Sequence, residues 1–182
     1  MPRLWIARHA VPLIAAGTCY GQLDVAADKD ATQQAARHLA EDLPQALVVT
    51  HSPLQRCEQL ALALKAQRLD LPSMPDTRLM EMHFGAWEGI AWDVIDPQAL
   101  AAWTAQFASH APGGGESLQI FMARVASALD DVRRSGRDSL WISHAGVARA
   151  ASLVATGQPV TQAHEWPKEG PGFGEYVVLN LA

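Results

Sequence analysis

An arginine and a histidine stand next to each other where the first apolar run of the chain ends. Arg8 and His9 follow Leu4–Ala7, a run with the character of a buried strand, and His144 follows Leu140–Ser143 in the same way. In open α/β sheets, ligands bind at the carboxyl ends of the strands. A guanidinium presents paired donors that match phosphate oxygens, and an imidazole can attack the phosphorus that they hold. The two runs therefore predict a site for a small anion.

Two further residues add to this set from other parts of the chain. Arg56 falls in the first turn of a helix predicted to begin at Ser52-Pro53, with serine as N-cap, proline at the first helical position, and backbone N–H groups that favour an anion. Glu81 has no basic residue directly beside it, and a neutral glutamic acid suits protonation of a poor alkoxide leaving group. Glu88 is a nearby competitor for that acid role.

Strand and helix patterns alternate along the chain, which predicts an α/β fold. The expected strands are Leu4–Ala7, Ala46–Thr50, a short one within Leu71–Asp76, Leu140–Ser143 and Tyr176–Leu181. The expected helices are Asp30–Leu43, one from Ser52 to Leu69, Ser117–Arg134 and Gly146–Thr156. Four of these strands, all except Tyr176–Leu181, end at or lead into candidate site residues.

We expect a single domain over residues 1–182, with an irregular, lid-like excursion at about residues 80–115. That excursion holds Trp87, Trp92 and Trp103, together with the run Gly113–Gly115. The tryptophans are interpreted as packing within the core or lid, and contact of Trp87 or Trp92 with a substrate stays an alternative.

Composition narrows the class of protein. With 182 residues, 49% of them hydrophobic, the chain can fill one core and does not have the composition of a disordered protein. A net charge of -5 argues against a nucleic-acid partner, while a small phosphate needs only a few local cations. Cys19 and Cys57 match neither a metal spacing nor a disulfide framework. Without a signal peptide or an apolar stretch of ~20 residues, we expect a cytoplasmic protein and no membrane partner.

Taken together, these segments resemble the histidine phosphatase superfamily, which has the phosphoglycerate mutase-like fold. The matching motifs occur in the family's order and are Arg8-His9, Ser52–Cys57, Arg78–Glu81 with Phe84–Gly89, and Ser143–Gly146. The resemblance implies a three-layer α/β/α domain with a mostly parallel central sheet. It is greatest for the short branch that includes α-ribazole phosphatase, an enzyme of cobalamin synthesis, and implies a phosphomonoesterase that acts on a small phosphorylated metabolite.

The resemblance also implies roles for individual residues. His9 would be the nucleophile that forms a phosphohistidine, and Arg8, Arg56 and His144 would bind the phosphoryl oxygens. Glu81 would protonate the leaving oxygen and then help water to hydrolyse the intermediate. Neither a metal nor another cofactor is expected, because the arginines and histidines supply the positive charge.

The chain departs from the family pattern just after the Arg-His pair. Ala10, Pro12 and Ala15 stand where the family usually has a glycine, a threonine and an asparagine that touches the phosphate. We expect Gln22 or a backbone N–H of the Gly17–Gly21 loop to make that contact. Substrate binding is also assigned to Ala145, in the turn that follows the second histidine.

Three alternatives to hydrolysis remain at this point. A mutase would return the phosphoryl group to a second hydroxyl, and a non-catalytic module would bind a phosphorylated ligand without turnover. A metal site built from His9, His51, His83 and His144 is disfavoured, because the neighbouring arginines would repel a cation.

Overall fold

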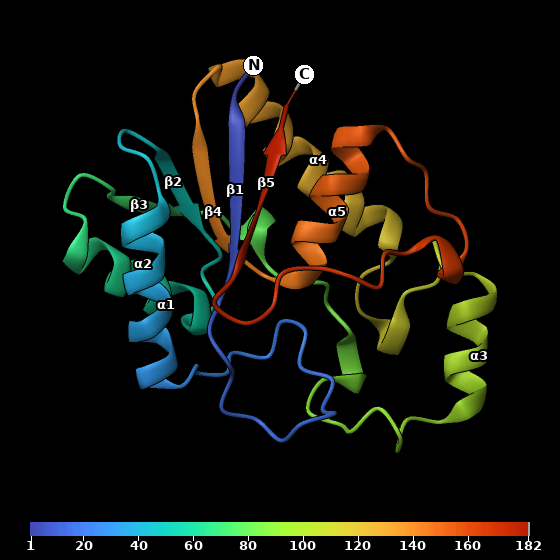
Figure 1. Cartoon of the computed structure of the whole chain (residues 1–182). Coiled ribbons are helices and arrows are strands. Elements are labelled where there is room, and N and C mark those ends of the chain that lie inside the picture. The colour runs from blue at the N-terminus through green and yellow to red at the C-terminus, as the bar shows by residue number, and fades with distance from the viewer. Residues whose placement is uncertain (182) are drawn as a thin grey trace.

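A five-stranded sheet forms the middle layer of the protein, in a computed structural model that describes residues 1–181 (Figure 1). The strand order is β3-β2-β4-β1-β5, and only β5 runs antiparallel to its neighbour. The strands are β1 (Arg3–Arg8), β2 (Val48–His51), β3 (Ser73–Pro75), β4 (Ser139–Ser143) and β5 (Tyr176–Asn180). The mostly parallel α/β architecture expected from the sequence is confirmed.

Side chains of each central strand alternate between two separate cores. From β1, Leu4 and Ile6 pack into one cluster, while Trp5 and Ala7 pack into the cluster on the opposite face. All four side chains are buried, which is why the strand is a continuous apolar run rather than an alternating one. The sheet must therefore be covered on both faces.

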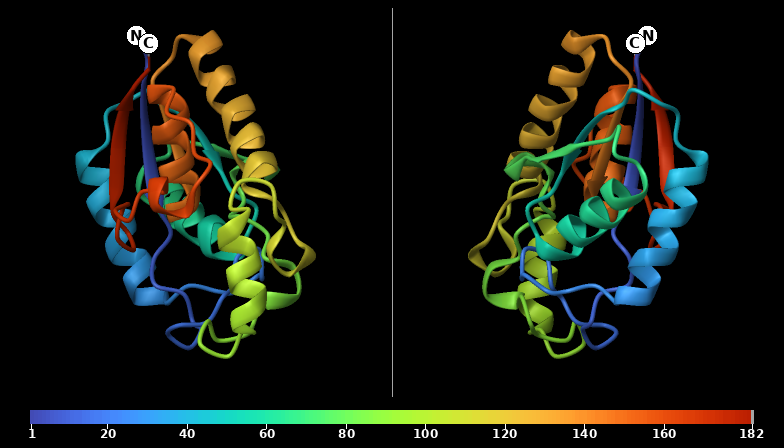
Figure 2. Two further views of the ribbon diagram at one scale, coloured as in Figure 1. Left: turned by 90° about the vertical axis from the view of Figure 1, so that its right-hand side faces the viewer. Right: turned by 90° about the vertical axis from the view of Figure 1, so that its left-hand side faces the viewer.

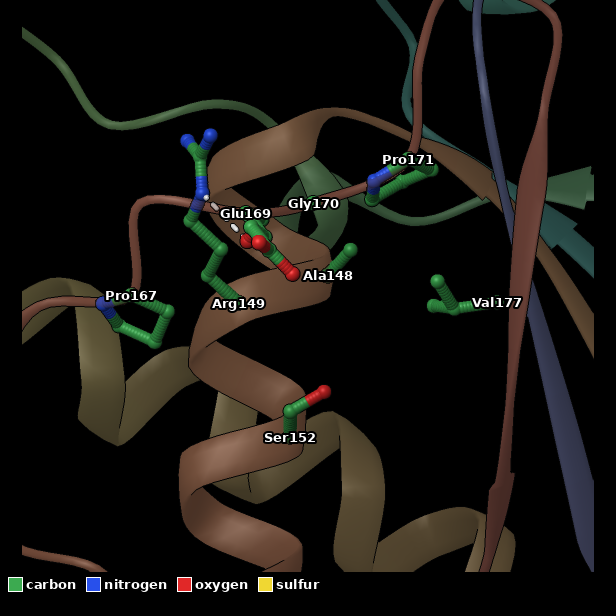
Figure 3. Close-up of a pocket in the computed structure, with 8 residues that line it drawn as sticks. All are labelled: Ala148, Arg149, Ser152, Pro167, Glu169, Gly170, Pro171 and Val177. Carbon is green, nitrogen blue, oxygen red and sulfur yellow. Dashed lines mark hydrogen bonds between the residues drawn. The ribbon is translucent and has the colours of Figure 1, made fainter.

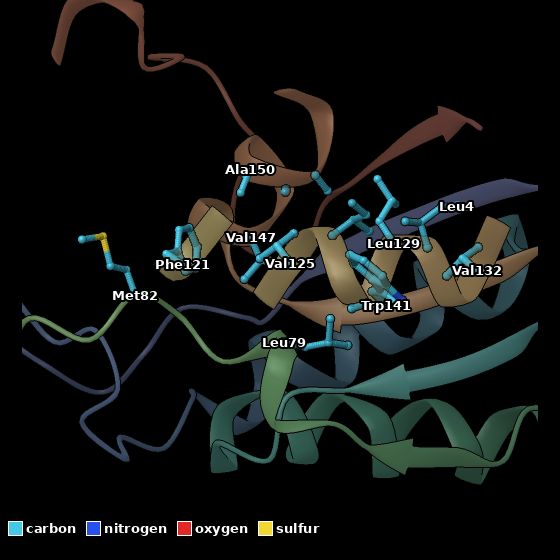
Figure 4. Close-up of a cluster of buried hydrophobic side chains, with 14 of the residues drawn as sticks. Leu4, Leu79, Met82, Phe121, Val125, Leu129, Val132, Trp141, Val147 and Ala150 are labelled. Carbon is cyan, nitrogen blue, oxygen red and sulfur yellow. The ribbon is translucent and has the colours of Figure 1, made fainter. Parts of the chain in front are cut away.

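Helices α1 (Lys29–Asp42) and α2 (Gln55–Gln67) cover one face, and α4 (Leu118–Ser135) and α5 (Ala145–Thr156) cover the other (Figures 1 and 2). Figure 4 shows apolar side chains of α4, among them Val125 and Leu129, packed with Trp141 of β4. Ser117 caps α4 as expected, since its hydroxyl accepts a hydrogen bond from the Ile120 N–H.

The predicted start of α2 is wrong by two residues. Leu54 is the N-cap residue and makes no side-chain cap, and Gln55 is the first helical residue. The Ser52 hydroxyl lies 2.9 Å from Nε2 of His144, so this serine connects two strand ends instead of capping the helix. Arg56 still lies in the first turn, as predicted.

The carboxyl ends of β1, β2 and β4 meet at one edge of the sheet, opposite both chain termini (Figure 1). The excursion lies beyond this edge, with α3 (Pro97–Ala105) beside the main layers (Figure 2). It also contains the short 3-10 turns η2 (Gly85–Trp87) and η3 (Pro112–Gly114). A similar turn, η1 (Thr77–Leu79), leads into it, and η4 (Ala163–Glu165) follows α5. Within residues 1–181, no helix has the length and apolar character that a membrane crossing requires.

Candidate active site

His9 follows the last residue of β1 and is 1% exposed. Its Nδ1 lies 2.7 Å from the Ala10 carbonyl oxygen, and its Nε2 lies 3.3 Å from Nε of Arg56. A carbonyl only accepts and a guanidinium only donates, so Nδ1 carries the proton and Nε2 carries the lone pair. Burial and then the charge of Arg56 lower the pKa of His9 to about 3. The imidazole is therefore neutral, with the lone pair of Nε2 beside an arginine.

Arg56 reaches His9 from the first turn of α2 and is completely buried. Its two terminal nitrogens donate to carbonyl oxygens of the loop between β1 and α1, over 2.6 Å to Gly21 and 2.8 Å to Leu23. The guanidinium also lies 5.0 Å from the centre of the Tyr20 ring. These contacts hold the loop against the sheet edge and fix the cation beside His9.

Arg8 directly precedes His9, and its guanidinium packs against Phe173. The guanidinium carbon is 3.7 Å from the ring centre, and one terminal nitrogen donates over 3.2 Å to the Pro171 carbonyl. Arg8 Nε is buried and has no partner among residues 1–181, so it is a donor that remains for a ligand. The Phe173 ring also lies 5.7 Å from the His9 ring.

His144 ends β4 in the same way that His9 ends β1, and their ring centres are 5.2 Å apart. Nε2 of His144 contacts the Ser52 hydroxyl at 2.9 Å and Sγ of Cys57 at 3.5 Å. Burial, and then the charge of His9, lower the pKa of His144 well below its usual value. Burial raises the pKa of Cys57 to about 12, so this thiol is a protonated core group.

The carboxylate of Glu81 is held at the start of α5. Its Oε2 accepts from the Gly146 N–H over 3.1 Å, and its Oε1 accepts from the Met82 N–H over 3.0 Å. A Cβ at position 146 would overlap Oε1 of Glu81, so the close approach of the carboxylate to the helix requires glycine there. Gln22 donates its side-chain N–H to the Glu81 carbonyl over 2.9 Å, which fixes the backbone of the same residue.

A cavity of about 520 Å³ opens above these groups. Arg8, Glu81, Ala145 and Gly146 form its polar end, while Arg149 lies one turn further along α5. Its remaining wall is largely aromatic and includes Tyr20, Phe84, Trp92, Trp103, Phe107, Phe121 and Trp166. Such a wall, with few polar groups, is typical of a site for a small organic ligand.

A smaller cavity of about 290 Å³ lies on the other side of Arg149, between α5 and the segment before β5 (Figure 3). Its lining includes Ser152, Pro167 and Val177, and it contains none of the residues predicted for the chemistry. The larger cavity is therefore the candidate substrate site.

The structure brings Arg8, His9, Arg56 and His144 together at the sheet edge, as the sequence predicts, and places Glu81 on the adjoining cavity. His9, Arg56 and His144 lie beneath the cavity rather than on its surface.

The structure also places the residues for which the sequence left the role open. Gln22 binds the Glu81 backbone and does not line the cavity, so its side chain is not a direct replacement for the family asparagine. Glu88 accepts from the Gln22 and Phe84 backbone N–H groups and also lies off the cavity. Trp92 lines the cavity and Trp87 does not.

Sequence reasoning missed three residues of this region, which are Ser52 as a partner of His144, Phe173 beside Arg8, and Arg149. The spacing of Arg149 from the histidine motif was the one available signal, because a residue four positions after Ala145 lies on the same helix face. Among residues 1–181, no three His, Cys, Asp or Glu side chains come together in a way that could hold a metal ion.

Comparison with known proteins adds independent findings. Residues 4–171 match the family described as "Histidine phosphatase superfamily (branch 1)". Glucosyl-3-phosphoglycerate phosphatase of Mycolicibacterium vanbaalenii is 33% identical over 196 residues, covering 99% of this chain and 84% of the relative. Putative phosphoserine phosphatase 2 of Hydrogenobacter thermophilus is 29% identical, covering 86% of this chain and 80% of the relative.

Solved structures show the same likeness. The native structure of a mycobacterial glucosyl-3-phosphoglycerate phosphatase superposes with a TM-score of 0.83 at 28% identity, covering 97% of this chain and 89% of that one. The complex of that enzyme with inorganic phosphate gives a TM-score of 0.82 at 28% identity, with 99% and 90% covered. None of these names contains α-ribazole, so they lend no support to that particular substrate.

Proposed function

The chain belongs to the histidine phosphatase superfamily and is a phosphatase of that type, and we propose that it hydrolyses small phosphomonoesters through a phosphohistidine at His9. The observation that carries this proposal is the state of the His9 ring. Its Nδ1 proton is held by the Ala10 carbonyl, and its Nε2 lone pair faces a buried arginine. A phosphoryl group that replaces the Arg56 Nε–H as the partner of Nε2 meets a neutral nucleophile and a cation together.

In the first step, Nε2 of His9 attacks phosphorus and the bond from phosphorus to the ester oxygen breaks. The imidazole ring becomes a phosphorylated cation, and the Ala10 carbonyl keeps accepting from its Nδ1–H. Protonated Glu81 gives its proton to the leaving oxygen, which departs as an alcohol. Arg8, Arg56 and His144 surround the phosphoryl oxygens and stabilise the charge that develops on them.

In the second step, the Glu81 carboxylate accepts a proton from water while the water oxygen attacks phosphorus. The P–N bond breaks, its electron pair returns to Nε2, and inorganic phosphate leaves with His9 neutral and Glu81 protonated again. The geometry supports Glu81 for both transfers because Glu81 lines the cavity, whereas Glu88 does not.

The substrate is proposed to be a phosphorylated metabolite with an organic leaving group that fits the aromatic cavity. α-Ribazole 5′-phosphate, which the sequence suggested, is tested beside glucosyl-3-phosphoglycerate and phosphoserine, the compounds in the names of the relatives. The compound with the highest kcat/KM in this panel identifies the substrate class.

The decisive experiment compares His9→Ala with wild type and with His83→Ala, whose side chain is 46% exposed and lies off the cavity. We expect wild type and H83A to release inorganic phosphate and to form an acid-labile ³²P adduct, and H9A to do neither. EDTA should leave turnover unchanged, because Arg8 and Arg56 supply the positive charge.

Two results would overturn the proposal. Interconversion of phosphoglycerates without release of phosphate would indicate a mutase. An inactive, unlabelled wild type that still binds phosphate would indicate a binding module.

A further inference from the structure

Arg149 is a cation that the proposed reaction does not use. It lies on α5, four residues after Ala145, and is half-buried. Its Nε donates over 3.2 Å to the Glu169 carbonyl, and one terminal nitrogen donates over 3.0 Å to the Lys168 carbonyl. Among residues 1–181, no carboxylate pairs with it within 4.0 Å. Backbone carbonyls therefore hold the guanidinium in place without neutralising its charge.

Arg149 lines the smaller cavity, and it also lines the larger one. Arg149 lines it together with Arg8 and Glu81, and in Figure 3 its side chain reaches away from Ser152, past the Glu169 carbonyl. Burial lowers the pKa of Arg149, with Glu81 raising it and Arg8 lowering it further. An arginine remains charged even so, because its usual pKa is far above neutrality.

The number of positive charges near His9 indicates that Arg149 is not needed to bind the phosphoryl group. Arg8 and Arg56 flank His9 and match the charge of a phosphoryl dianion, which leaves one cation of the cavity without a counterpart. Residues four apart on a helix have Cβ atoms about 5–6 Å apart, so Arg149 lies roughly that far beyond the turn at Ala145. A part of the substrate that binds to Arg149 therefore belongs to the leaving group and lies close to the ester oxygen.

Resting on the proposed function, we propose that Arg149 selects substrates whose leaving group carries a carboxylate near the phosphorylated carbon. One guanidinium provides one positive charge and a planar pair of donors, which matches a carboxylate rather than a second phosphate dianion. The aromatic wall beyond it, which includes Trp103 and Trp166, then covers the less polar remainder of the leaving group.

The test uses two esters that differ at one group, 3-phosphoglycerate with a carboxylate and glycerol 3-phosphate with a hydroxymethyl. Wild type should have the higher kcat/KM for 3-phosphoglycerate. Arg149→Met should lose about 10- to 100-fold of that kcat/KM, mainly through KM, and stay within about threefold of wild type on glycerol 3-phosphate. Arg149→Lys keeps the positive charge but lacks the planar pair of donors, so its preference for 3-phosphoglycerate should lie between those of wild type and Arg149→Met.

Turnover of p-nitrophenyl phosphate separates the two proposals. A wild type that cleaves this ester but shows no preference between the matched pair, or an R149M variant with an unchanged preference, overturns the role of Arg149 alone. A wild type that cleaves none of the three esters overturns the proposed function and this inference with it. An equal loss on all three esters in R149M shows that Arg149 supports the fold of the site and does not read the carboxylate.

Discussion

Two regions of the site are held together in opposite ways. One is the sheet edge, and the other is the cover, which is the aromatic part of the excursion above that edge. At the edge, Arg8, His9 and His144 are placed by strand ends whose registers are fixed by parallel pairing, with Arg8 opposite Ser143. In the cover, Phe84 and Trp103 come from the excursion and meet through ring packing, with centres 6.0 Å apart. Polar contacts of fixed geometry hold the sheet edge together, whereas packing between apolar rings holds the cover together.

The connection between these regions explains how the cover is positioned. The Cys19 N–H donates to the Ile90 carbonyl, and the Gly89 N–H donates to the Cys19 carbonyl, so the loop after β1 pairs with the excursion. Arg56 holds that same loop from below through its Gly21 and Leu23 contacts. The groups at the sheet edge therefore tolerate little displacement, whereas substitutions in the cover can change which substrate the cavity accepts.

The largest effect is expected at the acid. Glu81→Gln should lower kcat on an alkyl phosphomonoester by about 10²- to 10⁴-fold, because neither the leaving alkoxide nor the attacking water then exchanges a proton. With p-nitrophenyl phosphate, whose leaving group needs no proton, one equivalent of nitrophenolate should appear in a burst and the phosphoenzyme should accumulate. Rapid-quench measurement of both products tests this.

Glu88→Gln is the matched control for this substitution. Its Oε1 can still accept from Gln22 and Phe84, so activity should stay near wild type. A larger loss in E88Q than in E81Q would transfer the acid role to Glu88.

A single methyl group at the start of α5 should have the next largest effect. Gly146→Ala places a Cβ against Oε1 of Glu81, and a displacement of about 1 Å at a catalytic group costs up to about 10²-fold in rate. We expect kcat to fall and the melting temperature to change little, because alanine favours the helix. Ser152→Ala, on the same helix and off the larger cavity, should leave kcat unchanged; equal activity of all three proteins would contradict the placement of Glu81.

Acid should lower the free energy of unfolding through the buried histidines of the sheet edge and not through the aromatic residues of the cover. The pKa of His9 is about 3 in the folded protein and near 6.5 when unfolded, so the unfolded chain binds more protons below pH 6.5. The stabilisation is complete above pH 6.5 and is lost as pH falls from there toward 3, by about 1.4 kcal/mol per pH unit for this group. The lowered pKa of His144 adds to the same slope.

Urea unfolding between pH 7 and pH 5 measures that slope. His9→Gln should show a smaller slope than wild type, and His38→Gln, which removes an exposed histidine, should show the wild-type slope. Identical slopes in all three proteins would mean that His9 is not buried in its neutral form.

The smallest effect on generic turnover is expected in the cover. Trp92→Leu should change kcat/KM on p-nitrophenyl phosphate by only about threefold, while shifting the preference among larger esters more strongly, since Trp92 lines the cavity away from His9. Val94→Ala, an exposed change in the same segment, should alter neither. If Trp92→Leu lost as much activity on p-nitrophenyl phosphate as Gly146→Ala, the cover would be as sensitive to substitution as the sheet edge, and the comparison between the two regions would be wrong.

Much of the edge could be predicted from the sequence because strand ends are local features. The apolar runs before Arg8 and His144 required buried strands, and parallel pairing then required their ends to meet. The helix start at Ser52-Pro53 was predicted wrongly because the Ser52 hydroxyl contacts His144, a residue 92 positions away that no local pattern reveals.

The sequence by itself therefore determined the family and the alternating fold, and it predicted the candidate reacting groups, since motif order and hydrophobic runs are properties of the chain. Only the tertiary structure decided the protonation pattern of His9, the fixing of Glu81 by the Gly146 N–H, and the presence of Arg149 beside the reaction. These depend on burial and on contacts between distant segments. The physical reason is that a pKa or a donor pair is set by what packs around a group, and packing brings together residues that the chain keeps apart.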